Sequence, residues 1–182
     1  MQLICQGEIS AFDEIYSRYS KRLLYFFCRM LGHDEERAQD FLQDLFLKII
    51  EKSNLYQEEK KFSTWIYTIA NNMCKSEYRY RLVRKNIRNE GNVDLILPDE
   101  SPDEHPSEKN IDRMNFRKAL FCELESLKSE QRAVFLLKYQ ENFSIKKISS
   151  IMKCSEGTVK SRLFYATKKL AEKLKDYNTT IN

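Results

Sequence analysis

The segment from Phe143 to Lys175 has the strongest pattern in the chain: two short stretches of helical periodicity separated by a tight turn. Ser144 precedes the first stretch and Ser155 precedes the second, and serine is a preferred cap of helix N-termini. Apolar residues recur every three or four positions, as on the buried face of a helix: Ile145, Ile148, Ile151, Met152, Val159, Leu163, Ala166 and Leu170. A short helix, a turn at 153–154 and a second helix indicate a helix-turn-helix.

The outer face of the second predicted helix carries side chains that can contact DNA. These candidates are Ser155, Thr158, Lys160, Ser161, Arg162, Tyr165 and Lys168. Two amphipathic helices joined by a short turn also describe an antiparallel helical hairpin whose basic face is only solvated. The charge distribution favours DNA, because residues 112–175 hold 15 Lys/Arg against 7 Asp/Glu, whereas the whole chain of 182 residues has a net charge of +4. Such a concentration of positive charge attracts phosphates whatever the base sequence.

Composition predicts an all-α protein. Only 4 Gly and 3 Pro occur in 182 residues, which disfavours a turn-rich β fold. The longest apolar run, Leu23–Cys28, is far shorter than the roughly 18 residues of a membrane span. The start of the chain lacks the pattern of a signal peptide, so we expect a cytoplasmic protein without membrane insertion.

Cysteine and histidine give no sign of a metal or cofactor site. The five cysteines are scattered singly, and we interpret them as small buried apolar residues rather than disulfide partners: Cys5, Cys28, Cys74, Cys122 and Cys154. The two histidines have no paired ligands nearby in the sequence. We therefore expect no metal and no cofactor.

The N-terminal part predicts three helices. Helical spacing runs from Phe12 to Leu31, then from Asp34 to Ile50, and again from Phe62 to Arg88 after a polar loop at 52–61. On the second helix a mixed acidic and apolar outer stripe is a candidate docking surface for a basic partner; it consists of Asp40, Gln43, Asp44 and Leu47. The third helix mixes aromatic, amide and basic residues, a combination that suits single-stranded nucleic acid but equally fits a core with a solvated basic end.

Residues 89–110 differ in composition from both flanking parts. They contain all three prolines and seven acidic residues against one Lys, too little apolar surface to fold alone. We therefore predict two small helical domains, 1–88 and 112–177, joined by an acidic, proline-containing linker at 89–111. The C-terminal domain would be the helix-turn-helix.

Three segments of the chain resemble the extracytoplasmic-function class of bacterial RNA polymerase sigma factors. They are AQDFLQDLF at 38–46, FSTWIYTIANN at 62–72 and EGTVKSRL at 156–163. The resemblance covers nearly the whole chain apart from the two ends and the linker.

The resemblance implies a role for each segment. The helix with Asp40, Gln43, Asp44 and Leu47 would dock on core RNA polymerase. The loop and helix around Trp65, with Lys61, Asn72 and Lys75, would open and read the downstream (minus-ten) promoter element. The helix-turn-helix would read the upstream (minus-thirty-five) element as duplex. Whether an anti-sigma factor binds the chain stays open.

Two residues depart from the pattern of that class. Ser149 stands where the first helix of the motif usually has Ala, and Lys153 stands where the turn usually has Gly. Serine is small enough to preserve close packing of the helices. A residue other than Gly in a left-handed turn costs about 1 kcal/mol, so we expect a slightly reshaped turn.

The leading interpretation is a sigma factor that directs promoter recognition and opening and has no catalysis of its own. The sequence contains no phosphate-binding Gly loop and no nucleophile motif. The alternative is a stand-alone helix-turn-helix regulator whose N-terminal part only oligomerises. An enzyme with a helical active site is a third interpretation, and it would need clustered titratable residues in a cleft.

Overall fold

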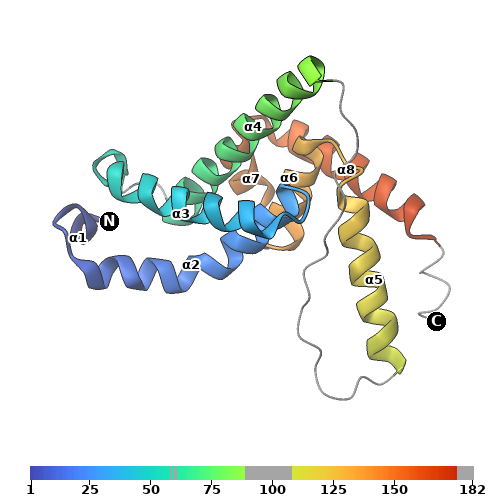
Figure 1. Ribbon diagram of the computed structural model, residues 1–182, viewed down its shortest axis with the longest axis horizontal. Helices are drawn as coiled ribbons and strands as arrows, with labels where there is room; N and C mark the ends of the chain where they lie inside the picture. The colour runs from blue at the N-terminus through green and yellow to red at the C-terminus, as the bar shows by residue number, and fades with distance from the viewer. Residues whose placement is uncertain (58, 60, 89–107, 176–182) are drawn as a thin grey trace.

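The computed structural model describes the chain except for residues 58, 60, 89–107 and 176–182 (Figure 1). The helices are α1 (Gln2–Cys5), α2 (Ile9–Met30), α3 (Glu35–Glu51), α4 (Phe62–Arg88), α5 (Glu108–Leu124), α6 (Ser129–Tyr139), α7 (Ile145–Met152) and α8 (Glu156–Lys173), with a 3₁₀ turn, η1 (Ser53–Leu55), between α3 and α4. These described ranges contain no β-strand, and the predicted all-α class is confirmed.

The predicted linker falls almost wholly outside the described residues. Its last four positions are the exception, because α5 already begins at Glu108 and not at 112. The division into two domains therefore stays a prediction, and we refer below to an N-terminal half (α1–α4) and a C-terminal half (α5–α8).

The N-terminal half packs α2 against α3, with α4 across both (Figure 1). The chain reverses after α2 at Gly32, whose φ of 82° is readily adopted only by glycine. Asp34 then caps α3, since its side chain accepts a hydrogen bond from the backbone N–H of Arg37. The core of this half is formed by the large side chains of Leu23, Phe26, Phe27, Leu45, Ile49 and Ile66.

Four aromatic rings fix the start of α4 against the rest of the N-terminal half. Phe62 lies at the centre, with ring centroids 5.3 Å from Tyr19, 5.9 Å from Tyr56 and 5.8 Å from Trp65. Such tilted and edge-to-face contacts are favourable beyond the area that they bury. They place Tyr56 beside the first turn of α4.

In the C-terminal half, α6, α7 and α8 pack on one another, and α5 runs outward from them while its last turns contact α8 (Figure 1). The two halves also contact each other directly. α4 packs on α7, α2 lies near α6, and the ring of Tyr67 meets that of Phe143 edge-on at 5.1 Å. The buried apolar residues of both halves form one continuous cluster.

The cysteines differ in exposure, and one part of the sequence interpretation is wrong. All five are free thiols, and Cys28 and Cys74 are buried as expected. Cys122 and Cys154 are only partly buried, and Cys5 is exposed. Cys5 lies in the four-residue helix α1, where only Ile4 is buried, so the core does not reach it.

Candidate nucleic-acid interface

Both helices of the helix-turn-helix begin at the predicted caps. The hydroxyl of Ser144 accepts a hydrogen bond from the N–H of Lys147 at 3.2 Å, and that of Ser155 accepts one from the N–H of Thr158 at 3.1 Å. Each bond satisfies one of the amide groups that a helix N-terminus leaves without an intrahelical partner. The start of the recognition helix α8 is therefore fixed by residues of its own sequence.

The turn between α7 and α8 is left-handed at Lys153, with φ 52° and ψ 50°. Ser149 closes this turn, because its Oγ donates to the carbonyl of Cys154 at 2.5 Å and its own carbonyl accepts from the N–H of Cys154 at 3.2 Å. The sequence suggested only that Ser149 was small enough for close packing. The structure adds a hydrogen bond that holds the turn.

The outer face of α8 presents most of the predicted DNA-binding residues to solvent. Exposed side chains are those of Ser155, Lys160, Ser161, Tyr165 and Lys168. The apolar stripe faces the other way, with Val159, Ala166 and Leu170 buried. Lys169, by contrast, donates to the carbonyl of Ser126 and so contacts its own half of the molecule.

Two of the predicted DNA-binding residues on α8 are partly buried, Thr158 and Arg162. The hydroxyl of Thr158 lies 2.9 Å from that of Ser155, so both belong to the cap of α8. Arg162 places one terminal nitrogen 3.8 Å from the sulfur of Cys154, beside the turn. A guanidinium has five N–H donors, so this weak contact leaves Arg162 able to donate elsewhere.

The sequence interpretation missed Phe164 on the same helix. Its side chain is 61% exposed, and its ring lies 5.5 Å from that of Tyr165. A large apolar side chain on an otherwise polar helix face can contact thymine methyl groups in the major groove. Its position directly after Leu163, which faces inward, could have predicted its exposure, since neighbouring residues on a helix point in different directions.

On α3 the structure brings the four predicted docking residues onto one exposed face. Asp40, Gln43, Asp44 and Leu47 all face solvent, and Leu47 is 57% exposed. Lys48 approaches Asp44 only at 4.0 Å, so the acidic character of this face is little reduced. Ile50, also exposed, extends its apolar part.

The three predicted residues for the downstream element lie on or just before α4. Lys61 and Asn72 are exposed, and Lys75 is partly buried. Towards the end of the helix, exposed Tyr78 and Tyr80 accompany basic side chains, and the guanidinium of Arg84 lies 4.9 Å from the ring centroid of Tyr80. Exposed rings beside cations suit stacking with unpaired bases.

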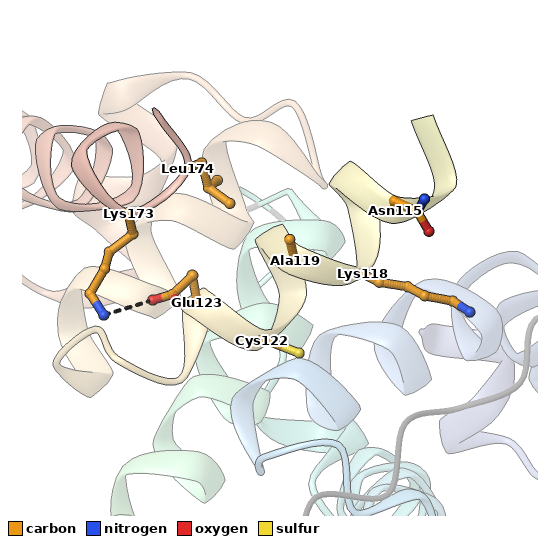
Figure 2. Close-up of a pocket in the computed structure, with 7 residues that line it drawn as sticks. All are labelled: Asn115, Lys118, Ala119, Cys122, Glu123, Lys173 and Leu174. Carbon is orange, nitrogen blue, oxygen red and sulfur yellow. Dashed lines mark ion pairs between the residues drawn. The ribbon is translucent and has the colours of Figure 1, made fainter. Parts of the chain in front are cut away.

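A shallow pocket lies between α5 and the end of α8, away from these residues. Figure 2 shows its lining, including Cys122, Leu174 and the ion pair of Lys173 with Glu123 at 3.6 Å. None of the predicted site residues lines it. In the described part of the chain, no three His, Cys, Asp or Glu residues come together to hold a metal ion. No helix there combines the length and apolar character that crossing a membrane requires.

Comparisons with known proteins match both halves of the chain. The Sigma-70 region 2 model matches residues 15–82, and the Sigma-70, region 4 model matches residues 117–170. The ECF RNA polymerase sigma factor SigW of Bacillus subtilis is 26% identical over 94% of this chain and 92% of its own length. The RNA polymerase sigma-H factor of Pseudomonas aeruginosa is 26% identical over 91% of this chain and 87% of its own length.

A solved structure shares the fold. It is the sigma factor RpoE of Bartonella quintana in complex with the anti-sigma factor NepR, with a TM-score of 0.70 and 26% sequence identity over 91% of this chain and 97% of that chain. An all-helical fold that ends in a helix-turn-helix is typical of DNA-binding proteins of transcription. The chain belongs to the sigma-70 family, within its extracytoplasmic-function class, and is a sigma factor of transcription initiation.

Proposed function

We propose that this sigma factor uses three separate surfaces: the outer face of α3 for core RNA polymerase, Lys61 with the first half of α4 for the downstream promoter element, and α8 for the upstream element. The observation that carries the proposal is α8. Its N-terminus is fixed by Ser155, and Lys160, Ser161, Tyr165 and Lys168 on its outer face are exposed.

The upstream element is read as duplex by the first turns of α8. A recognition helix of this motif enters the major groove with its N-terminal residues nearest the bases. Lys160, Ser161 and Arg162 occupy those turns, and Arg162 can bind a guanine edge with two hydrogen bonds. Phe164 and Tyr165 add apolar contact, while Lys168 lies further along the helix and contacts phosphate.

The downstream element is captured by α4 after the strands separate. Asn72 is exposed and can pair with a base edge, while Lys61 and Lys75 lie at either end of the same region and attract the strand. The aromatic cluster around Phe62 holds the preceding loop in place. A rigid platform reduces the entropy lost when the strand binds.

Core polymerase binds the acidic and apolar face of α3. Asp40 and Asp44 attract cationic residues of the polymerase, and Leu47 supplies apolar contact that the chain itself leaves exposed. A factor that acts on polymerase and promoter DNA in this way works in the cytoplasm and needs no catalytic residue or cofactor of its own. An anti-sigma factor is a candidate regulator, as RpoE of Bartonella quintana was solved bound to NepR.

Transcription with purified core RNA polymerase tests the proposal. The chain is expected to elute with core polymerase in gel filtration and to direct transcripts from discrete start sites on genomic DNA. A chain that binds duplex DNA but never assembles with polymerase would instead support a stand-alone regulator with an N-terminal oligomerisation domain. The match to region 2 over residues 15–82 favours the first outcome.

A further inference from the structure

The first helix of the chain, α1, is short, but its end is fixed by its own sequence. Two hydrogen bonds close it, from the N–H of Gly7 to the carbonyl of Ile4 at 3.0 Å and from the N–H of Glu8 to the carbonyl of Leu3 at 3.0 Å. Gly7 has φ 83°, and this pair of bonds around a left-handed glycine is a common helix stop. The first residues of a domain are usually poorly ordered unless they are tied down, so the order of α1 indicates that it packs on another element.

The side chain of Ile4 attaches α1 to the rest of the N-terminal half. α1 contacts η1 and α2, and Ile4 is the only buried residue in it. The exposed fraction of Ile4 is 7%, whereas that of the neighbouring Leu3 is 55%. Among the buried apolar residues that the structure describes, Ile4 alone lies outside the continuous cluster of the core. The contact of Ile4 is therefore local, and it orders α1 and η1 without supporting the main core.

A second step leads from η1 to the start of α4. Tyr56 directly follows η1, and its N–H donates to the carbonyl of Ser53 at 3.3 Å. The ring of Tyr56 meets that of Trp65 edge-on, with the centroids 5.4 Å apart. Trp65 also contacts Phe62, which Tyr19 of α2 supports at 5.3 Å. Tyr56 is thus the link through which α1 and η1 act on Trp65.

Trp65 lies on the part of α4 that is proposed to hold the opened strand. Its side chain is partly exposed on the first turn of the helix, and in the sequence it stands between exposed Lys61 and exposed Asn72. Aromatic rings stack on unpaired bases, while cations beside them follow the backbone. A ring that is already held in one orientation loses less entropy on binding than a mobile one. The order of Tyr56 and Trp65 therefore favours capture of the strand.

We propose that Ile4 is a positioning residue for the downstream promoter element, an inference that rests on the proposed function of α4. Through η1 and Tyr56, Ile4 holds the ring of Trp65 in the orientation that stacks on the opened strand. Ile4 itself is buried and acts only through these residues. The upstream duplex is bound by α8 and core polymerase by α3, so neither of these contacts depends on Ile4.

The variant Ile4→Ser tests the inference, with Leu3→Ser as its matched control. Both variants replace one aliphatic side chain of the same short helix by the same polar side chain, but only Ile4 is buried. Ile4→Val retains most of the buried surface and should behave as the unaltered chain. Ile4→Ala is a milder second variant in case the serine unfolds the N-terminal half.

The fluorescence of Trp65 is the first measurement, because Trp65 is the only tryptophan in the chain. In the free, folded protein, Ile4→Ser should shift the emission of Trp65 to longer wavelength and increase its quenching by acrylamide. Leu3→Ser and Ile4→Val should leave both unchanged. A variant that is only less stable keeps the spectrum of the native state in the molecules that remain folded, so a changed spectrum reports a moved ring.

The second measurement is capture of a promoter whose downstream element is already unpaired, by each variant assembled with core polymerase. We expect Ile4→Ser to weaken capture about fivefold, since Phe62 still supports Trp65 and only the ordering through Tyr56 is lost. Leu3→Ser and Ile4→Val should capture the strand as the unaltered chain does. Protection of the upstream duplex and assembly with polymerase should be the same for all variants.

Two outcomes would overturn the inference. One is an unchanged emission of Trp65 in both Ile4→Ser and Ile4→Ala. The other is an altered emission together with normal capture of the strand, under conditions in which Asn72→Ala loses that capture. If Asn72→Ala also captures the strand normally, the proposed function of α4 fails, whereas an altered emission of Trp65 still shows that Ile4 positions this ring.

Discussion

At the scale of single residues, burial controls the chemistry of the cysteines. Burial raises the pKa of the Cys28 thiol from 9.0 to about 11 and that of the Cys74 thiol from 9.0 to about 12. The thiolate is the reactive form, so both side chains should be inert in the native protein. We expect iodoacetamide at pH 8 to alkylate exposed Cys5 first and to reach Cys28 and Cys74 only after unfolding, as peptide mass spectrometry will show. Equally fast labelling of Cys74 would contradict its burial.

The raised pKa of Cys74 also predicts a dependence of stability on pH. In the unfolded chain this thiol ionises near its ordinary pKa of 9.0, whereas in the folded chain it stays protonated until about 12. Its neutral form therefore favours the folded state fully below pH 9, and that contribution is lost as pH rises towards 12. In denaturant titrations from pH 8 to 11, Cys74→Ala should lose stability with pH less steeply than the unaltered chain. An identical slope would count against this assignment.

The hydrogen bonds of Arg132 could not be predicted from residue patterns. Nothing in the sequence indicated a role for it, because its partners at Arg29 and Met30 lie more than 100 residues earlier in the chain. Glu141 was likewise counted only as a charge. Spacing within a helix predicts which residues share a face, but it carries no information about which distant helix that face will meet.

At the scale of elements, the turn of the helix-turn-helix retains a residue with an unfavourable conformation. Lys153 adopts φ 52°, which side chains other than Gly occupy at a cost of about 1 kcal/mol. Lys153→Gly should raise the free energy of unfolding by up to about 1 kcal/mol in urea titrations. Asn142→Gly is the control, because Asn142 at φ 54° already tolerates this region and should gain less. A loss of stability in Lys153→Gly would mean that the lysine side chain itself stabilises the turn.

The helix α3 carries the polymerase contact in our account. Reversing Asp40 and Asp44 to Lys should weaken assembly with core polymerase by at least about tenfold, because like charges across an interface repel. Stability should change by under about 0.5 kcal/mol, since both side chains are exposed. The pair Asp13→Lys and Glu14→Lys, on α2, makes the same change in net charge and should assemble normally. Normal assembly of the α3 variant by gel filtration would remove this face from the account.

Helix starts were the most predictable parts of the chain. Ser144 and Ser155 were identified as caps from sequence, and Asp34 was placed at the start of its helix, because a cap and its partner lie within three residues of each other. The exposure of the four docking residues on α3 followed from helical periodicity in the same way. Phe164 was missed and Cys5 was wrongly taken as buried, because only tertiary packing decides whether a single apolar residue faces the core or solvent.

At the scale of the whole molecule, the structure joins halves that the sequence divides. Composition predicted a linker at 89–111, and its first nineteen residues lie outside the described part of the chain. The contact of α4 with α7 and the ion pair of Arg22 with Glu141 could not be foreseen, since they depend on how two amphipathic units meet.

In the proposed function, α8 binds the upstream duplex and α4 binds the opened downstream strand. One pair of variants tests this separation on a promoter found by start-site mapping. Arg162→Ala removes a side chain that can discriminate a guanine by roughly 1–3 kcal/mol in duplex DNA. Asn72→Ala removes an exposed amide from the surface proposed to hold the opened strand.

Footprinting together with permanganate reactivity, on complexes of each variant with core polymerase, separates the two contacts. We predict that Arg162→Ala loses protection of the upstream duplex but still captures a template whose downstream element is already unpaired. Asn72→Ala should keep upstream protection and lose permanganate-reactive thymines at the downstream element. If both variants reduce both signals to the same extent, the two halves do not read separate elements and the account is wrong.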